Sequence, residues 1–321
     1  MQSRRPILVT GASGFIGREV AALLLARGHA VRGVVPSATS RPVPGAQTVH
    51  LPPEADADAW DRALEGAAGV VHVPGRMQRL DARGRDPGPD FWLRARDQAL
   101  LLGERAAAQG VERLVFLSTA TVHGPATPHG PVDEDAPLAP ATAYARAKLE
   151  TEQGLGEVAA GSRLGLTVLR PPLVYGPEVR GNFLRLLKLV DRGLPLPLGL
   201  VRNRRSMLFM GNLADAMATC LAHPNAPGRT FLPTDGEAVS TPELVRLMAR
   251  ALGRPARLAP VPAQLVRAAF AAMGRSRALG PLLGSFVVDA SRIRREIDWT
   301  PPFTMAEGVA ETVDWLRHTA G

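Results

Sequence analysis

The feature that most constrains this chain lies near its start, where an apolar run, a glycine-rich turn and a helical pattern follow one another. PILVT (6–10) has the length and character of a buried strand, and REVAALLLARG (18–28) repeats apolar residues at helical spacing. TGASGFIG (10–17) joins the two. A helix that begins directly after such a turn presents free N–H groups and a positive partial charge to a phosphate. The stretch therefore predicts a dinucleotide-binding unit, with a purely structural glycine turn as the alternative.

The three glycines of this turn have separate expected roles. Gly11 permits the tight turn, Gly14 lets the backbone approach a pyrophosphate, and Gly17 lets the helix pack closely against the strand.

Strand and helix patterns continue to alternate through the first half of the chain. We expect further strands at 30–35, 48–51, 69–73, 112–119 and 165–172, and long helices at 91–110 and 142–159. Strands separated by helices of this length imply right-handed crossovers and a parallel sheet covered on both faces.

Beyond residue 172, proline and glycine punctuate the pattern, with helices expected at 181–192, 211–222, 241–252, 262–273 and 303–318. The polar, glycine- and proline-rich segment 76–90 predicts a mobile loop. The fold class predicted is α/β: a Rossmann-type doubly wound parallel sheet over 1–172 and a smaller, mainly substrate-binding domain over 173–321. Parts of 206–234 are expected to return to the first domain.

Composition limits the classes of function. The 321 residues carry a formal charge of +8, which favours anionic partners, although arginines scattered over a solvated surface would give the same figure. No arginine cluster interleaves with aromatics as in single-strand binders, and no apolar run reaches the ~18 residues of a membrane span. The single cysteine, Cys220, excludes an intramolecular disulfide and a multi-cysteine metal site. We expect a cytoplasmic protein with no metal, no nucleic-acid partner and no membrane span.

Tyr144 and Lys148 stand one helical turn apart in ATAYARAK (141–148). The chain has only two tyrosines. It also has only two lysines, since nearly all of its positive charge is carried by arginine. A phenol has a pKa near 10, and a neighbouring ammonium favours its ionised form. The spacing predicts a tuned proton donor beside a nucleotide, and an exposed pair of no consequence is the alternative.

A hydroxyl-rich strand end lies upstream, in FLSTATVHG (116–124), with Ser118, Thr119 and Thr121. A hydroxyl there can donate a hydrogen bond to a reacting oxygen, and an ordinary strand end rich in Ser and Thr is equally compatible.

These motifs together resemble the extended short-chain dehydrogenases/reductases of the NAD-dependent sugar-nucleotide epimerase/dehydratase group. The glycine turn, Thr119 and the Tyr144–Lys148 pair stand in that family's order. More narrowly, residues 170–199, 203–206 and 231–244 resemble bacterial enzymes that reduce UDP-4-keto-6-deoxy-N-acetylhexosamines to UDP-N-acetylquinovosamine for surface polysaccharide.

The resemblance implies roles for particular side chains. Tyr144 would be the proton donor, Lys148 would lower its pKa and hold the nicotinamide ribose, and Thr119 would polarise the substrate oxygen. Substrate contacts would come from Ser118, from Asn182 at the UDP diphosphate and from Arg205 of NRRS. Cofactor contacts would come from Gly11, Ser13, Gly14, Phe15, Ile16, Gly17, Arg18, Lys148 and Pro171.

Several positions depart from the family pattern. The acid that ends the second strand of NAD-binding relatives is Val35 here, and the Asp near the adenine is His50. Two alanines after the fourth strand are Pro74 and Gly75, and a helix asparagine is Ala95. Without an acid to repel a 2′-phosphate, and with Arg18, Arg32 and Arg41 in reach, the cofactor is NADP or NAD, with NADP favoured narrowly.

The function expected from the resemblance is NAD(P)H-dependent 4-keto reduction of a UDP-sugar. The alternatives are a nucleotide-sugar 4-epimerase and a non-catalytic binder of NAD(P) or nucleotide sugars. Family members usually dimerise through two long helices, here 91–110 and 142–159, so a homodimer is expected.

Overall fold

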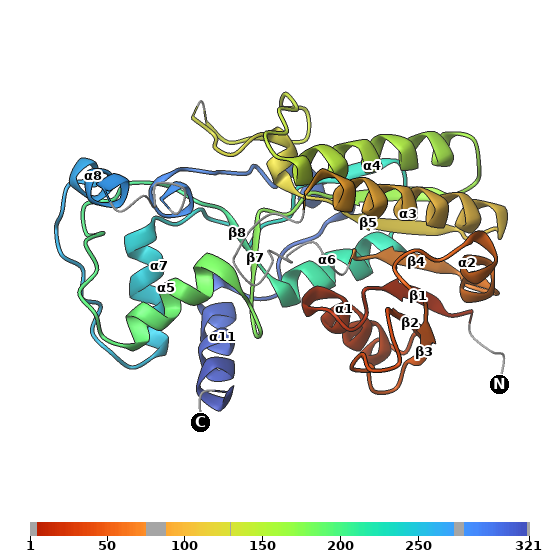
Figure 1. Cartoon of the computed structure of the whole chain (residues 1–321), viewed down its shortest axis with the longest axis horizontal. Helices are drawn as coiled ribbons and strands as arrows, with labels where there is room; N and C mark the ends of the chain where they lie inside the picture. The colour runs from red at the N-terminus through yellow and green to blue at the C-terminus, as the bar shows by residue number, and fades with distance from the viewer. Residues whose placement is uncertain (1–4, 75–87, 129, 273–278, 320–321) are drawn as a thin grey trace.

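The computed structural model describes residues 5–74, 88–128, 130–272 and 279–319, and within them seven parallel strands form one sheet (Figure 1). Their order is β3-β2-β1-β4-β5-β6-β9. The strands are β1 (Ile7–Thr10), β2 (Val31–Val35), β3 (Gln47–His50), β4 (Gly69–His72), β5 (Arg113–Leu117), β6 (Gly165–Leu169) and β9 (Arg229–Phe231). The sheet confirms the predicted α/β, Rossmann-type fold class.

The order of the strands reverses beside β1, because β2 pairs with one of its edges and β4 with the other. Thr10 is in register with His72, and His72 is in register with Phe116 of β5. The carboxyl ends of these three strands therefore meet at one edge, at the point where the strand order reverses. Ligands of open α/β sheets bind at such a point.

Helices cover both faces of the sheet. On one face α1 (Phe15–Ala26) and α6 (Met210–Ala222) share a core with β1 and β4, through side chains such as Leu24 and Leu213. On the other, α2 (Ala57–Leu64), α3 (Pro89–Ala108) and α4 (Ala143–Ala160) pack a second core that includes Leu102 and Leu155. Figure 1 shows α3 and α4 side by side above the sheet and α1 below it. Both faces are apolar, as nearly continuous hydrophobic strands require.

A second lobe is built around its own apolar core. The short strands β7 (Leu173–Tyr175) and β8 (Met207–Phe209) pair in parallel. Around them lie α5 (Gly181–Asp191), α7 (Thr241–Ala251) and α11 (Met305–Thr319), which bury Phe183, Met248 and Val313. Three further helices complete this lobe and the return to the sheet: α8 (Ala263–Ala272), α9 (Gly280–Leu283) and α10 (Ser291–Ile297). In Figure 1 this lobe lies to the left of the seven-stranded sheet.

The predicted elements agree closely with those observed. The expected strands and long helices all occur, and β9 adds the segment after α6 to the edge of the main sheet. Helix α2 was not predicted, since its eight residues are few for a periodic pattern, although Asp56 caps it by accepting from the Ala59 N–H at 2.8 Å. The predicted mobile loop at 76–90 lies largely outside the described residues. Among the helices that are described, none has the length and apolarity to cross a bilayer.

Candidate active site

The glycine turn lies at the carboxyl end of β1 and has the backbone conformation that its sequence requires. Gly11 adopts φ +63°, the left-handed region that favours glycine. A Cβ on Gly17 would stand 2.1 Å from the Gly11 carbonyl oxygen, and one on Gly14 would stand 3.1 Å from it. Any side chain at Gly17 would therefore force the helix away from the turn.

Helix α1 begins at Phe15 with Gly14 at its N-cap and no side chain that caps it. Its first turn also contains no acidic residue. The N–H groups of this turn are thus available to an anionic ligand, and the helix dipole adds a positive partial charge. Together with the close-packed glycines, this cradle fits the pyrophosphate of a dinucleotide.

Tyr144 lies in the first turn of α4, whose N-cap is Thr142, and its side chain is half-buried. Its ring packs against Trp92 of α3, with centroids 5.2 Å apart. Burial raises the pKa of Tyr144 to about 12, and a hydrogen bond with Thr119 partly offsets this rise. Thr119, buried after β5, also lies with its hydroxyl 3.0 Å from that of Thr121. The hydroxyls of Thr119 and Tyr144 thus lie together, and the expected role of Thr119 at the substrate oxygen stays a prediction.

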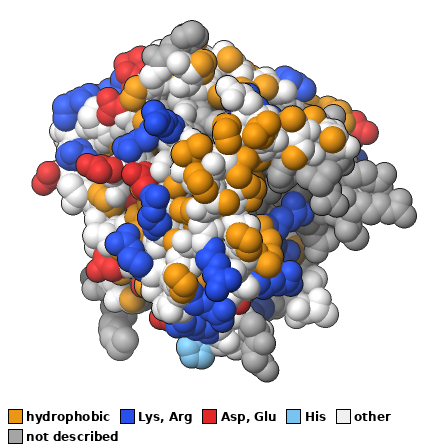
Figure 2. Space-filling view, turned by 90° about the vertical axis from the view of Figure 1, so that its left-hand side faces the viewer, with side chains coloured by type: hydrophobic (Ala, Val, Ile, Leu, Met, Phe, Trp, Pro, Cys, Tyr) orange, Lys and Arg blue, Asp and Glu red, His pale blue; other side chains and the backbone are white. Residues whose placement is uncertain are grey.

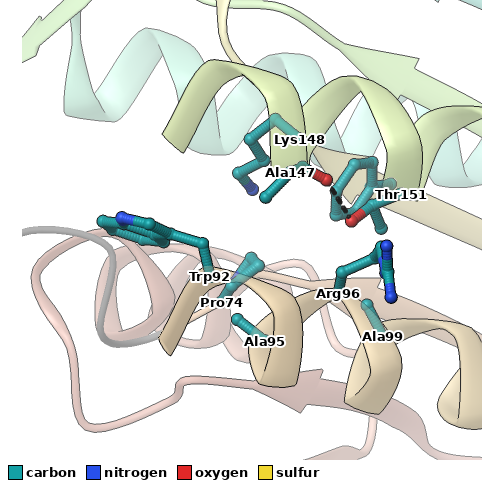
Figure 3. Close-up of a pocket in the computed structure, with 9 residues that line it drawn as sticks. Pro74, Trp92, Ala95, Arg96, Ala99, Ala147, Lys148 and Thr151 are labelled. Atoms are coloured by element: carbon teal, nitrogen blue, oxygen red, sulfur yellow. Dashed lines mark hydrogen bonds between the residues drawn. The ribbon is translucent and has the colours of Figure 1, made fainter. Parts of the chain in front are cut away.

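Lys148 is 3% exposed, and Figure 3 shows its side chain extending from α4 into the space between α4 and α3. Its ammonium donates to the Leu117 carbonyl oxygen and lies 4.5 Å from the centre of the Phe116 ring. Burial lowers the pKa of Lys148 to about 7, although the Glu152 carboxylate one turn later opposes the shift. Burial dominates the pKa of Tyr144 in this structure, and the expected lowering of that pKa by Lys148 stays a prediction.

A small cavity lies between α3 and α4, beside Lys148 (Figure 3). Trp92, Ala95 and Pro74 contribute to its lining, so two positions that depart from the family pattern meet here. Its volume of about 10 Å³ is close to that of a single water site. The cavity is too small for any ligand much larger than water.

A buried ion pair lies one turn beyond Lys148 on α4. Arg170, at the end of β6, donates from its Nε to both carboxylate oxygens of Glu152 at 3.1 and 3.0 Å, and both side chains are less than a tenth exposed. Ser118 donates to the same carboxylate. Arg170 Nη1 also lies 3.1 Å from His123 Nε2. Because guanidinium can only donate, His123 must be neutral there, with its Nδ1–H directed at the Ala136 carbonyl oxygen 3.1 Å away.

This network was not predicted from the sequence, although Glu152 follows Lys148 at helical spacing. The network also gives Ser118 a different role from the substrate contact that the resemblance implied. The hydroxyl of Ser118 serves a buried carboxylate and the residue is 3% exposed, so a direct contact with substrate stays a prediction that this geometry does not favour. Through its two ring nitrogens, His123 connects Ala136, in the segment before α4, to Arg170 at the end of β6.

His72 ends β4 and is a second group that sequence reasoning left aside. Its ring stacks on Phe116, and Nδ1 lies 2.8 Å from the Thr10 hydroxyl. Nε2 is buried and has no hydrogen-bond partner among the described residues. Burial, followed by the charge of Lys148, lowers the pKa of His72 to about 3. The ring is therefore neutral at physiological pH.

The open end of β2 carries the residues expected to recognise the adenosine ribose. Val35 is buried, whereas Ser37 lies in an exposed hydroxyl cluster with Thr39 and Ser40. His50 is exposed at the end of β3. Gly75 lies outside the described residues. No acidic side chain follows β2 directly, as the sequence indicates.

An acid reaches this region from the second lobe instead. Glu178 pairs with Arg18 of α1, and its other oxygen lies 3.7 Å from Arg41. Its backbone adopts φ +67°, an uncommon conformation for a residue with a side chain. Hydrogen bonding from Arg18 lowers the pKa of Glu178. Arg18 and Arg41, the two arginines here that could bind a 2′-phosphate, are therefore both paired with the Glu178 carboxylate.

The remaining predicted residues lie farther along the chain. Pro171 is buried, and its carbonyl oxygen accepts from the Ala120 N–H at 2.9 Å. Asn182 is half-buried in the first turn of α5, which no side chain caps. Ser13, Phe15 and Ile16 are half-buried in the glycine turn.

Arg205 is half-buried, and its pKa is lowered by burial. Its backbone pairs with Val239 and Phe286, and its Nη1 donates to the Gly284 carbonyl oxygen at 3.1 Å. No carboxylate pairs with it among the described residues. Phe286 in turn packs against Ala120, next to Thr119, so Arg205 belongs to the wall of the same region. A half-buried guanidinium without a carboxylate is suited to an anionic ligand.

Comparisons with known proteins agree with this geometry. The model of the NAD dependent epimerase/dehydratase family matches residues 7–232. A UDP-glucose 4-epimerase of Vibrio cholerae is 33% identical over 314 residues, covering 96% of this chain and 94% of the relative.

Two solved structures share the fold. A UDP-glucose 4-epimerase of Thermotoga maritima with UDP-glucose has a TM-score of 0.75 at 22% identity, covering 98% of this chain and 100% of that one. A UDP-glucose 4-epimerase of Thermus thermophilus in complex with NAD has a TM-score of 0.73 at 24% identity, covering 97% of this chain and 99% of that one.

Proposed function

The chain belongs to the NAD dependent epimerase/dehydratase family, and on that premise we propose that it is a UDP-sugar 4-epimerase that uses NAD. The observation that carries the proposal is the meeting of Thr119, Tyr144 and Lys148 with the glycine turn at one edge of the sheet. The relative of highest identity reported above is a 4-epimerase, which favours epimerisation over the reduction expected from the sequence.

Tyr144 would act as the proton carrier at the sugar 4-oxygen. With a pKa raised to about 12, the phenol holds its proton at neutral pH and is suited to donate it when the 4-keto group is reduced. Thr119, within hydrogen-bonding reach of the phenol, would orient the same oxygen. To remove the proton from the 4-hydroxyl in the opposite direction, Tyr144 must become more acidic than it is in this structure.

Lys148 would supply that acidity. Its ammonium is held within the protein by the Leu117 carbonyl and the Phe116 ring, and a pKa of about 7 leaves it half charged near neutrality. Moving a positive charge toward the phenol would lower the pKa of Tyr144. A ribose that lies against Lys148 would exchange the Leu117 contact for hydroxyl groups, and the lysine could then turn.

The residues around the β1–α1 turn fit a dinucleotide. The uncapped start of α1 and the close-packed glycines would hold its pyrophosphate. When bound, the dinucleotide supplies the chemistry of hydride acceptance and return at carbon 4. We favour NAD over NADP, against the narrow preference drawn from the sequence, because Glu178 occupies the two arginines that a 2′-phosphate would need.

Arg205 and Asn182 would hold the UDP group. Arg205 offers a half-buried guanidinium with no carboxylate partner among the described residues, and Asn182 lies at the uncapped start of α5. A lone guanidinium and free helix N–H groups both favour phosphate oxygens as ligands.

Reduction of a UDP-4-keto-6-deoxy-N-acetylhexosamine is the second candidate. It is favoured by the resemblance of residues 170–206 to reductases of that kind. Both reactions require the same Tyr144 and differ in whether the 4-keto sugar is an intermediate or the starting compound.

One pair of assays separates the candidates. Purified protein is incubated with UDP-glucose, UDP-galactose or UDP-N-acetylglucosamine and a trace of NAD, and the sugar products are followed by proton NMR. Inversion at carbon 4 with a cofactor amount far below one per turnover supports the epimerase. Consumption of one NADH or NADPH per 4-keto sugar, without inversion in the first assay, would instead identify a reductase. Tight dinucleotide binding with neither reaction would identify a binding protein and contradict the proposal.

A further inference from the structure

The positive charge of this chain is concentrated in two segments of the second lobe. The chain has 38 Lys and Arg against 30 Asp and Glu. Residues 192–209 and 244–272 contain nine arginines and no acidic residue, so the remainder holds 29 basic residues against 30 acidic ones. The net charge of +8 is therefore a local property of these two segments and not a general excess of arginine.

The two segments lie side by side in the structure. Leu196 and Leu258 form a parallel bridge, and the Leu196 N–H donates to the Arg257 carbonyl oxygen at 2.8 Å. The Gly199 N–H donates to the Ala259 carbonyl oxygen at 2.9 Å, and the Arg257 guanidinium donates to the Gly193 carbonyl oxygen at 3.2 Å. Helix α8 follows immediately after this pairing.

Large apolar side chains are exposed on the same segments. Leu194, Leu200 and Leu265 are 44%, 48% and 60% exposed. Of the α8 residues whose side chains are described, only Val266 is buried, so this helix packs very little of its surface against the lobe. Figure 2 shows hydrophobic side chains gathered on the face seen from the left of Figure 1, with Lys and Arg around them and some Asp and Glu among these.

An ordinary surface helix buries an apolar stripe and exposes its polar side. Helix α8 instead exposes Leu265 and several alanines together with Arg267. Two acids border the segments, where Asp191 lies 3.7 Å from Arg254 and Glu243 lies 4.0 Å from Arg204. They leave Arg202, Arg257 and Arg267 without a carboxylate partner among the described residues. An exposed apolar patch fringed mainly by cations is complementary to a surface that has an anionic layer over an apolar layer.

We propose that the face formed by Leu194, Leu200, Arg202, Arg257, Leu265 and Arg267 docks onto an anionic lipid bilayer. The arginines contact lipid phosphates, and the leucines enter the boundary between headgroups and acyl chains. A nucleic acid would satisfy the arginines and leave the leucines in water, and a second copy of this face would bring like charges together. The proposal is independent of which reaction the active site performs.

The test is co-sedimentation of the full chain with sucrose-loaded vesicles. Vesicles of phosphatidylcholine mixed with phosphatidylglycerol are compared with vesicles of phosphatidylcholine alone, at low salt and at about 0.5 M salt, where charges are screened beyond roughly 4 Å. Binding to the anionic vesicles at low salt, weakened by salt and absent from the neutral vesicles, is the expected result.

Two matched pairs of variants locate the contact. Arg202→Gln/Arg267→Gln should reduce the partition coefficient about 30-fold, at roughly fivefold for each arginine near an anionic surface. Arg62→Gln/Arg163→Gln removes the same charge from exposed positions on the main sheet's side and should change binding less than about twofold. Leu265→Ser should weaken binding, whereas Leu138→Ser, at a leucine 44% exposed outside these segments, should not.

Several results would overturn the proposal. No sedimentation with anionic vesicles would do so, as would equal losses in the two arginine pairs. Light scattering of the protein alone provides a further check: a dimer that Leu265→Ser converts to a monomer, with no vesicle binding, would assign this face to self-association. Binding to a DNA or RNA duplex that exceeds binding to anionic vesicles would assign it to nucleic acid.

Discussion

The first turns of α4, which carry the proposed catalytic residues, and the carboxyl end of β2 lie at the same edge of the sheet, yet they are built in opposite ways. Around α4 the functional side chains are buried and connected: Lys148, Glu152 and Arg170 are each less than a tenth exposed and are joined through hydrogen bonds to β5 and β6. Beyond β2 lie the exposed hydroxyls of Ser37 and Thr39 and the exposed Arg41, and Arg18 reaches this region from α1. There, one carboxylate from the second lobe, that of Glu178, joins Arg18 and Arg41.

The difference shows where this protein requires rigidity. A proton donor must be held within a fraction of an ångström of its position, and a buried charge network resists displacement because any unpaired member is costly in low dielectric. Recognition of a ribose or phosphate tolerates long, solvated side chains. We therefore expect changes near α4 to abolish turnover or folding, and changes near β2 to alter preference only.

The largest effect is expected at Tyr144. Tyr144→Phe removes the proton donor and keeps the ring that packs against Trp92, so turnover should fall about 10²- to 10⁴-fold while NAD binding changes only a few-fold. The measurement is kcat together with a fluorescence titration of NADH. Tyr175→Phe is the control, since that phenol donates to Asp235 in the second lobe's core and should affect stability but not kcat. Turnover above half of the wild-type value in Tyr144→Phe would remove this residue from the mechanism.

The buried ion pair gives the next largest effect. Arg170→Met leaves the Glu152 carboxylate unpaired in the interior and should destabilise the fold by about 3–5 kcal/mol. Arg94→Met, which breaks an exposed pair with Glu54 at 3.5 Å, should cost under about 1 kcal/mol. Urea unfolding measures both.

A double variant sharpens the result for the ion pair. Arg170→Met/Glu152→Met removes both charges and should be more stable than Arg170→Met alone, because no buried charge is left uncompensated. If the double variant is no more stable than Arg170→Met, the pair contributes to the free energy of unfolding by packing and not by charge.

Acid sensitivity should follow from His72. Its pKa is about 3 in the fold and about 6.5 when unfolded, so below pH 6.5 the unfolded chain binds more protons. The stability that His72 contributes is full above pH 6.5 and is lost as pH falls toward 3, by about 2 kcal/mol at pH 5. The measurement is the free energy of unfolding in urea at pH 7 and at pH 5. His72→Gln should lose about 2 kcal/mol less than the wild type between these pH values. His50→Gln, at an exposed position, should lose as much as the wild type. An unchanged pH dependence in His72→Gln would mean that the ring takes up a proton in the folded protein.

The smallest effect is expected at the open end of β2. Glu178→Gln frees Arg18 and Arg41 for a 2′-phosphate, so the ratio of NADPH to NADH affinity should rise roughly fivefold, the size of an exposed charge pair of about 1 kcal/mol. Titration of both dinucleotides measures the ratio. Glu112→Gln, which releases Arg5 far from this edge, should leave the ratio unchanged. A constant ratio in Glu178→Gln would exclude this carboxylate from cofactor selection.

Short-range patterns predicted the parts of the protein that depend on local chemistry. Gly11 is required by the left-handed backbone of the turn, and Gly17 is required because a side chain there would collide with the Gly11 carbonyl oxygen. The Tyr144–Lys148 spacing reflects the pitch of one helix. The alternation of strands and helices likewise predicted a parallel sheet. Helix α2 was missed because it is short, and the buried role of Ser118 was missed because its partner lies 34 positions away.

The sequence by itself determined the glycine cradle, the alternation of strands and helices and the one-turn spacing of Tyr144 and Lys148, because each depends on residues within one turn or one element. Only the tertiary structure decided the environment of that pair. It buries Lys148 against Phe116, raises the pKa of Tyr144 and joins Glu152 to Arg170. It also brings Glu178 to arginines more than a hundred residues earlier. Burial and long-range charge pairing depend on which elements pack together, and periodicity along a single chain does not encode that.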